Sequence, residues 1–182
     1  MFQFKMTVVE GGAMKESILS NKRILAVDDE PDVLATLEEE ILNACQGCIF
    51  EKATNYAQAN ELIRSWTYDL IILDIMGVRG FDLLELAAAH RYPVVMLTAH
   101  AMTPEALKRS IELGARAYLP KEKLGEIVPF LEDVLKYENL TGWGRLLGNL
   151  KGFFNAHWGE NWKKVDEKFW KDFDEKIAFI RK

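Results

Sequence analysis

Apolar runs and amphipathic segments alternate five times along most of the chain. Each run is short, ends at a turn signal and precedes a segment in which apolar positions recur every three or four residues. The runs are predicted strands, and they cover residues 23–27, 49–53, 70–74, 94–98 and 117–119. Strands that alternate with helices in this way predict βαβ units and a parallel sheet.

The segments after the strands carry helix start and stop signals. Pro31 and Pro104 suit first helical turns, Asn55 suits an N-cap, and Gly114 suits a C-terminal stop. The predicted helices end near residues 44, 66, 90, 114 and 137. Runs that are apolar at consecutive positions, such as 94–97, indicate a sheet covered on both faces. We therefore predict a doubly wound α/β domain over residues 22–137.

Residues 138–182 have a different pattern and are predicted to form a helical C-terminal extension. Two apolar stripes recur there at helical spacing, and we expect Gly159 to separate two helices. The first stripe contains Trp143, Leu146, Leu147, Leu150, Phe153 and Phe154; the second, on one long helix, contains Trp158, Trp162, Val165, Phe169, Phe173, Ile177 and Ile180. Residues 1–21 precede the first strand, and we expect this N-terminal segment to be disordered, with Met14 as an alternative start.

The stripes leave two interpretations open. They favour a core-facing or helix-pairing surface, and the alternative is a helix over 141–158 that lies in a membrane interface. Gly144, Gly148 and Gly152 either let another helix approach closely or mark a loose linker.

Composition narrows the class of protein. The 182 residues are 49% hydrophobic and 28% charged, as in globular proteins, and the net charge of −5 argues against nucleic acid as the main partner. No apolar stretch reaches the roughly 18 residues needed to span a bilayer, and the first residues lack a signal-peptide pattern. We expect a cytoplasmic protein for which a membrane is not a partner.

Cys45 and Cys48 form a C-Q-G-C motif. This spacing suits a redox pair or half of a zinc site, but zinc needs further ligands and the three histidines are scattered. Reactive pairs usually lie at a helix N-terminus, whereas this motif follows the helical segment 33–44. The favoured interpretation is a helix cap followed by a strand entry.

Polar side chains stand where four of the predicted strands end. Asp28 and Asp29 follow the first strand, Asp74 ends the third, Thr98 ends the fourth, and Lys121 follows the fifth. Ligands of open parallel sheets bind beyond the carboxyl ends of the strands, so these side chains are expected to meet. Clustered carboxylates require a cation, and oxygen ligands with an open face suit Mg²⁺. Thr98 and Lys121 offer a hydroxyl donor and a point charge for a phosphoryl group.

The ordered motifs VDDEP, LD, LTA and LPK resemble those of response-regulator receiver domains of two-component signalling. The resemblance covers about residues 22–137 and implies a flavodoxin-like (βα)5 fold with strand order 2-1-3-4-5. It also implies that Asp74 is the phosphoacceptor. Asp28, Asp29, Asp74 and the Met76 carbonyl would then hold Mg²⁺.

The same resemblance assigns the remaining roles. Thr98 and Lys121 are the expected phosphoryl-sensing pair, and Tyr118 occupies the aromatic switch position. In the family, the Thr moves toward the phosphoryl group and the aromatic ring turns inward, which changes the face made by the fourth helix, fifth strand and fifth helix. His100 is expected to tune water access to the site.

Two departures from the family pattern stand out. The loop 76–80 is about two residues shorter than usual and has no Pro. Pro120 precedes Lys121 instead of following it, and Glu122 is a candidate to compete for the Lys121 charge. The rival interpretation is therefore a receiver-like scaffold or adaptor that binds partners without phosphotransfer.

The expected partner is a sensor histidine kinase or phosphotransfer protein. A homodimer would form through the face made by the fourth helix, fifth strand and fifth helix, or through the C-terminal helices. We do not expect an enzyme with a separate substrate, because no second substrate pocket or general base is visible in the sequence.

Overall fold

Five parallel strands form the centre of the molecule. The computed structural model describes residues 16–45, 47–99, 103–137 and 139–180. The strands are β1 (Arg23–Val27), β2 (Ile49–Ala53), β3 (Leu70–Asp74), β4 (Val94–Thr98) and β5 (Ala117–Pro120). Their order in the sheet is β2-β1-β3-β4-β5. The predicted doubly wound fold and strand order are confirmed.

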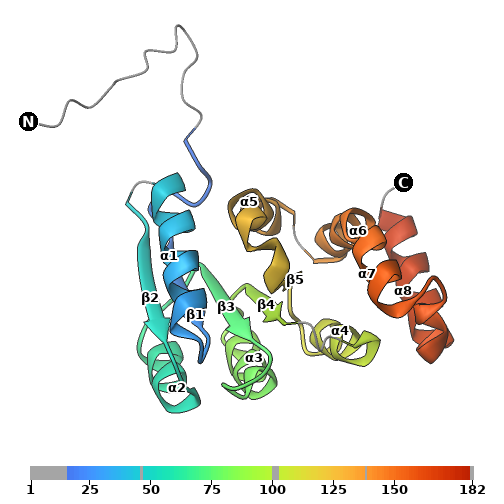
Figure 1. Cartoon of the computed structure of the whole chain (residues 1–182), viewed down its shortest axis with the longest axis horizontal. Helices are drawn as coiled ribbons and strands as arrows, with labels where there is room; N and C mark the ends of the chain where they lie inside the picture. Colours follow the sequence, from blue (N-terminus) through green and yellow to red (C-terminus); the bar gives the residue numbers. More distant parts are fainter. Residues whose placement is uncertain (1–15, 46, 100–102, 138, 181–182) are drawn as a thin grey trace, which may run out of the picture.

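Helices cover both faces of this sheet, as Figure 1 shows. Two lie on one face, α1 (Pro31–Ala44) and α5 (Ile127–Lys136), and three lie on the other, α2 (Tyr56–Ser65), α3 (Gly80–Ala89) and α4 (Pro104–Glu112). A 3-10 turn, η1 (Lys121–Glu126), precedes α5. The two-sided cover explains why every residue of β3 and β4 is buried, whereas β2, at an edge of the sheet, is only partly buried.

Local signals fix where the helices begin. Pro31 and Pro104 occupy first helical positions. The side chain of Asn55 accepts a hydrogen bond from the backbone N–H of Gln58 at the start of α2. Thr103 caps α4 in the same way. These caps satisfy amide groups that a helix leaves free, so the sequence places these starts correctly.

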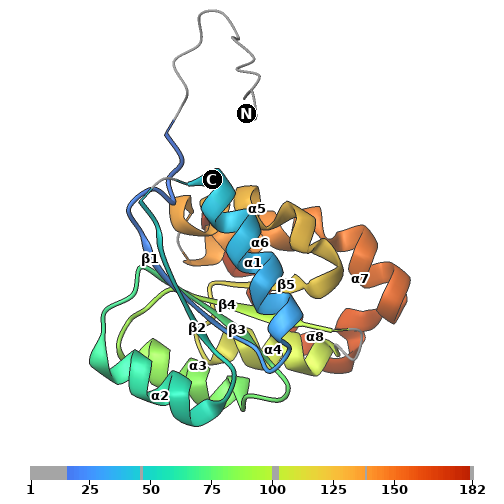
Figure 2. The same cartoon turned by 60° about the vertical axis from the view of Figure 1, so that its left-hand side comes forward.

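The C-terminal extension folds into helices beside the edge strand β5 (Figures 1 and 2). Its elements are α6 (Asn139–Asn149), α7 (Lys151–Trp158), a 3-10 turn η2 (Trp162–Asp166) and α8 (Glu167–Ile180). Gly159 ends α7 with a φ of 81°, a value that favours glycine, so the predicted break is confirmed. The single long helix expected after it is wrong, because η2 precedes α8.

Most residues of the apolar stripes point inward, whereas Val165 and Ile180 of the second stripe are exposed. Trp143, Leu146 and Phe154 are buried, as the core-facing alternative expects.

A Cβ added at Gly148 or Gly152 would meet nothing within 4 Å, so these glycines do not serve a close helix approach. Among the described residues, no helix is long and apolar enough to cross a membrane.

The chain before β1 is packed from residue 17 onward. Leu19 is fully buried, and the Ser17 hydroxyl donates to Glu132 of α5 at 2.6 Å. Packed structure therefore begins inside the segment 1–21, whose first 15 residues lie outside the described part of the chain.

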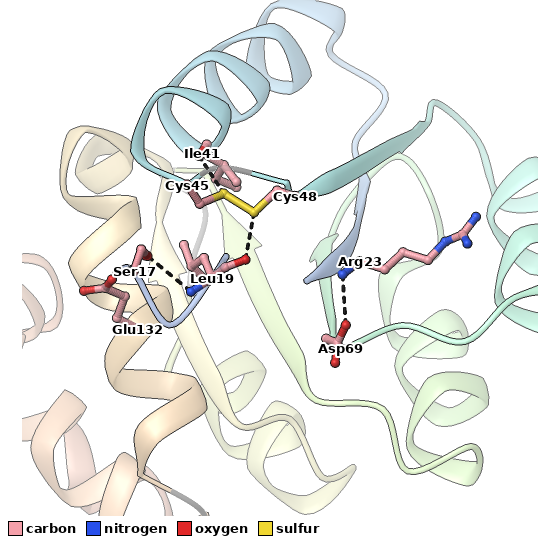
Figure 3. Close-up of a disulfide and its surroundings, with 8 residues drawn as sticks. All are labelled: Ser17, Leu19, Arg23, Ile41, Cys45, Cys48, Asp69 and Glu132. Atoms are coloured by element: carbon pink, nitrogen blue, oxygen red, sulfur yellow. Dashed lines mark hydrogen bonds between the residues drawn. A yellow bond between two sulfur atoms is a disulfide. The ribbon is translucent and has the colours of Figure 1, made fainter. Parts of the chain in front are cut away.

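Cys45 and Cys48 form a disulfide that joins the end of α1 to the residue before β2 (Figure 3). Cys45 is the C-cap of α1, as the favoured interpretation expected. The Sγ atom of Cys48 lies 2.8 Å from the Leu19 carbonyl oxygen. The pair therefore clamps one end of α1 against β2 and the segment before β1, at the opposite end of α1 from Asp28.

Candidate functional site

The sheet brings two buried carboxylates together at its carboxyl edge. Asp28 follows β1 and is completely buried, and Asp74 ends β3 with 3% of its surface exposed. Strands β1 and β3 are paired neighbours, so both side chains emerge at the same edge. A buried carboxylate needs a partner, because desolvation disfavours its charge.

Lys121 is that partner. Its Nζ lies 2.7 Å from Asp28 Oδ2, 3.2 Å from Asp74 Oδ1 and 2.8 Å from Glu30 Oε1. Lys121 reaches them because it directly follows β5, and only 12% of its side chain is exposed. The sequence pointed to Glu122 as an acidic competitor for Lys121. The structure shows Glu30 in contact with Lys121, and the place of Glu30 next to Asp28–Asp29 was the overlooked signal.

A third carboxylate completes an acidic cluster. One oxygen each from Asp28, Asp29 and Asp74 lies within 4.8 Å of the others, and Asp29 is exposed to solvent. In the described part of the chain, this is the only group of His, Cys, Asp or Glu side chains close enough to share a metal ion. Three hard oxygen donors with one side open to water fit Mg²⁺, which keeps several water ligands.

The short loop after Asp74 closes through residues with unusual backbone angles. Gly77 has a φ of 73° and Arg79 a φ of 55°. A Cβ on Gly80 would lie 2.0 Å from the Asp74 carbonyl oxygen, so only glycine allows the loop to return this closely. Arg79 is held by its ion pair with Asp82 at 2.6 Å and by the ring of Tyr56 at 4.2 Å.

The Met76 carbonyl, the expected fourth ligand, lies inside this loop. Its oxygen accepts a hydrogen bond of 2.7 Å from the Val78 N–H. A carbonyl oxygen has two lone pairs, so one remains for a cation. Its role as a ligand stays a prediction.

Gly77 controls the position of Asp29. A Cβ at residue 77 would lie 2.4 Å from the Asp29 Cγ. We expect Gly77→Ala to displace this carboxylate and to weaken Mg²⁺ binding by about tenfold, as disturbed ligand positioning does elsewhere. Isothermal titration with Mg²⁺ measures this, and Gly125→Ala, where a Cβ meets nothing within 4 Å, is the control. Equal affinities for the two variants would contradict the role of Gly77.

Thr98 and Tyr118 lie on the neighbouring strands β4 and β5. The Thr98 hydroxyl donates to the carbonyl of Ala99 at 3.1 Å, so it is turned toward its own backbone. Tyr118 is completely buried. Burial raises the pKa of the Tyr118 phenol, and the Thr98 side chain opposes that shift. His100, the expected tuning residue, lies outside the described residues.

Burial dominates the electrostatics of the acidic cluster. Desolvation, followed by the charge of Asp28, raises the pKa of Asp74 to about 6, and Lys121 only partly offsets this. Desolvation also raises the pKa of Asp28 against the pull of Lys121. Burial alone would lower the pKa of Lys121, but hydrogen bonds to Asp28 and Glu30 raise it above its usual value. The cluster therefore carries an excess of negative charge near neutral pH.

This excess predicts a pH-dependent stability. The folded-state pKa of Asp74, about 6, exceeds the unfolded value of about 3.9, so the folded state binds the proton more tightly. This tighter proton binding at Asp74 stabilises the folded state by at most about 3 kcal/mol. The stabilisation is complete below about pH 4 and is lost as the pH rises through 6. We expect the free energy of unfolding of Asp74→Asn, measured with urea in the presence of a chelator, to increase relative to that of the unsubstituted chain as the pH rises from about 4 through 6. A difference in free energy of unfolding between the two chains that stays constant with pH would contradict this prediction.

Solved structures share this fold. A putative response regulator from Chloroflexus aurantiacus aligns with a TM-score of 0.56 at 27% identity, covering 64% of this chain and 98% of that one. A CheY-like receiver domain protein from Methanospirillum hungatei aligns with a TM-score of 0.54 at 26% identity, covering 63% and 96%.

Sequence relatives agree with the structures. The two-component response regulator ARR18 of Arabidopsis thaliana is 36% identical over 130 residues, which are 69% of this chain and 20% of that protein. The transcriptional regulatory protein CpxR of Klebsiella pneumoniae is 37% identical over 102 residues, which are 54% of this chain and 42% of that protein. The chain thus spans less than half the length of either relative.

The family defined as response regulator receiver domain matches residues 24–131, which include the acidic cluster, Thr98 and Lys121. The match covers more than half of the chain and ends before the C-terminal extension. On fold, motif order and sequence, this chain belongs to the response regulator receiver domains of two-component systems.

Proposed function

We propose that Asp74 accepts a phosphoryl group from the phosphohistidine of a sensor histidine kinase or phosphotransfer protein. The observation that carries this proposal is the placement of one carboxylate, Asp74, between a lysine ammonium and two further carboxylates at an edge open to solvent through Asp29. An Asp74 oxygen attacks phosphorus, the phosphorus–nitrogen bond breaks, and the departing imidazole takes a proton.

The charges around Asp74 suit this transfer. Asp28 and Asp29, with the Met76 carbonyl, would hold Mg²⁺, which when bound supplies positive charge to the phosphoryl oxygens. Lys121 already lies 3.2 Å from Asp74 Oδ1 and would ion-pair with a phosphoryl oxygen. At neutral pH a carboxyl with a pKa of about 6 is mostly ionised, which a nucleophile requires.

Thr98 and Tyr118 would report the modification. The Thr98 hydroxyl, now bonded to the Ala99 carbonyl, has to turn to donate to a phosphoryl oxygen on Asp74. That turn alters the end of β4, the strand paired with the one that carries the buried Tyr118. The protein therefore acts by conformational change as a phosphoacceptor, with self-catalysed transfer and loss of the group, and not as an enzyme with a separate substrate.

A second function has its own supporting observation. Lys121 is paired with three carboxylates, and the Met76 carbonyl accepts a hydrogen bond from Val78, so these groups already have partners within the chain. A receiver-like scaffold that binds partners without phosphotransfer would have these properties.

Beryllofluoride, a mimic of the phosphoryl group, separates the two functions. In the phosphoacceptor, ¹⁹F NMR should show a bound beryllofluoride signal that requires Mg²⁺. The scaffold gives no bound signal at saturating Mg²⁺, and that result would overturn the proposed function.

A further inference from the structure

The disulfide between Cys45 and Cys48 contributes little as a structural cross-link. The two cysteines are three positions apart, and so short a ring removes little conformational freedom from the unfolded chain. The elements that flank the ring are already held by the hydrophobic core, in which Leu19 and Ile41 are completely buried. Stability alone is therefore a poor explanation of this pair.

The two sulfur atoms differ in their access to solvent. Cys45 is 4% exposed, whereas Cys48 is only partly buried and lies between two exposed residues, Gly47 and Ile49. Figure 3 shows the bond between the end of α1 and the residue before β2. A thiolate breaks a disulfide by attacking one of its sulfur atoms, so it has to reach that atom. In this pair the sulfur that an external thiolate can reach is that of Cys48.

A backbone carbonyl lies against each sulfur. The Sγ atom of Cys45 is 3.1 Å from the Ile41 oxygen, and that of Cys48 is 2.8 Å from the Leu19 oxygen. Each oxygen accepts one backbone hydrogen bond, from the N–H groups of Cys45 and Lys22 respectively, and has a second lone pair. A disulfide sulfur has no hydrogen to donate, but a thiol has one. The acceptors for both thiols of the reduced pair are therefore already in place.

The same surroundings oppose the thiolate form. Cys45 lies at the C-terminal end of α1, where the helix dipole is negative, and a carbonyl oxygen faces each sulfur. Thiol–disulfide exchange proceeds through the thiolate, so we expect this pair to exchange slowly at neutral pH. Slow exchange suits a site that responds to the redox state of its surroundings better than it suits a catalyst.

The turn before β1 is in contact with this pair. A Cβ on Gly47, between the two cysteines, would lie 2.4 Å from the Oδ1 of Asn21 in this turn. The Leu19 carbonyl, which faces Cys48, also closes the turn by accepting the Lys22 N–H at 3.0 Å. A thiol at Cys48 adds a hydrogen bond to this carbonyl, and the disulfide removes it.

We propose that Cys45 and Cys48 form a reversible redox site whose substrates are low-molecular-weight thiols and their disulfides. Cys48 is the reacting sulfur, and oxidation loosens the turn formed by residues 17–22. The site is independent of phosphoryl transfer at Asp74, because the cysteine pair and the acidic cluster lie at opposite ends of α1.

Reduction takes two exchange steps. A thiolate RS⁻ attacks the Cys48 sulfur, the sulfur–sulfur bond to Cys45 breaks, and Cys45 leaves as a thiolate that takes a proton from water. A second RS⁻ attacks the R-group sulfur of this mixed disulfide, which forms RSSR and releases Cys48 as a thiolate that is protonated in turn. Two RSH are thus oxidised to RSSR, and the protein disulfide takes up two electrons and two protons. Oxidation by RSSR follows the same steps in reverse.

Single substitutions in the full chain separate the roles of the two cysteines. Cys45→Ser leaves Cys48 to form a mixed disulfide that Cys45 can no longer resolve, and Cys48→Ser leaves only the buried Cys45. Cys48→Ser also keeps a hydroxyl donor for the Leu19 carbonyl, whereas Cys48→Ala keeps none. The last two variants therefore form a matched pair that tests the hydrogen bond without redox chemistry.

Reversibility is tested with glutathione, a tripeptide thiol. The full chain is equilibrated under native conditions with mixtures of reduced and oxidised glutathione, its free thiols are alkylated, and its mass is measured. We expect one two-electron transition that is the same from either direction, a glutathione adduct on Cys45→Ser, and severalfold less adduct on Cys48→Ser. A pair that stays disulfide or stays dithiol in every mixture would overturn the inference, and so would equal adducts on the two variants.

Hydrogen exchange of residues 17–22 tests the effect on the turn. We expect these amides to exchange severalfold faster in the oxidised chain than in the reduced chain. Cys48→Ser should exchange slowly and Cys48→Ala quickly, each to the same extent in reduced and oxidised glutathione. Equal exchange in the oxidised and reduced chains would show that oxidation does not loosen the turn and would overturn that part of the inference.

Discussion

Asp74→Asn is expected to abolish phosphoryl transfer and beryllofluoride binding while leaving the fold intact. The amide has nearly the shape of the carboxylate but is a poor nucleophile, and it lacks the charge that Lys121 pairs with at 3.2 Å. Incubation with Mg²⁺ and a small acyl phosphate, followed by intact mass measurement, should show one added phosphoryl group on the unsubstituted chain and none on the variant.

Asp69→Asn is the matched control for this experiment. Asp69 stands just before β3, pairs with Lys22 at 3.5 Å and lies at the opposite end of the strand from the acidic cluster. It should accept the phosphoryl group like the unsubstituted chain. If Asp74→Asn gains the same mass, the acceptor is another residue and the assignment of Asp74 is wrong.

Lys121→Met is expected to cause the largest loss of stability at the site. The substitution leaves Asp28 and Asp74 buried without their ammonium partner. Removing one member of a buried ion pair costs about 3–5 kcal/mol, because the remaining charge stays desolvated. Urea unfolding at pH 7 in chelator measures the loss.

Two conditions should restore the lost stability of Lys121→Met. Mg²⁺ supplies the missing positive charge, and pH 4 protonates carboxyls whose pKa values are raised by burial. Lys52→Met, which removes a half-exposed pair with Glu38, should lose about 1 kcal/mol or less under all conditions. If Lys121→Met lowers the free energy of unfolding equally with and without Mg²⁺, the lysine stabilises the site by packing and not by charge.

The sequence predicted the sheet and the strand-end residues well, for a physical reason. Consecutive apolar residues in β3 and β4 have few stable environments besides a sheet covered on both faces. Once the strands were placed, parallel topology required Asp28, Asp74, Thr98 and Lys121 to meet at one edge. No side-chain geometry was needed for that step.

The contacts inside the site could not be predicted in the same way. Glu30 follows the first acidic pair in the sequence, but only the path of the chain after β1 brings it into contact with Lys121. The roles of Gly77 and Gly80 depend on how closely the shortened loop passes Asp29 and the Asp74 carbonyl. The sequence gives the length of that loop but not its path.

The C-terminal extension shows the same limit at larger scale. Helical spacing predicted its apolar stripes but not its contacts with the rest of the chain. Trp143 donates a hydrogen bond to the Ala115 carbonyl, and Asp166 forms an ion pair with Lys108 of α4. Such contacts depend on where a helix docks, which periodicity does not encode. At the break, Trp162 of η2 packs its ring against Phe154 and Trp170, contacts that helical spacing alone does not predict.

Borohydride reduction tests the central claim most directly. One hydride attacks the carbonyl carbon of an acyl phosphate and releases phosphate, and a second hydride reduces the resulting aldehyde, so an aspartyl phosphate becomes homoserine. After incubation with Mg²⁺ and a small acyl phosphate, we predict homoserine at position 74 in the tandem mass spectrum of the digested chain, and only when Mg²⁺ is present. Unreduced Asp74, in a sample whose intact mass shows the added phosphoryl group, would contradict the assignment.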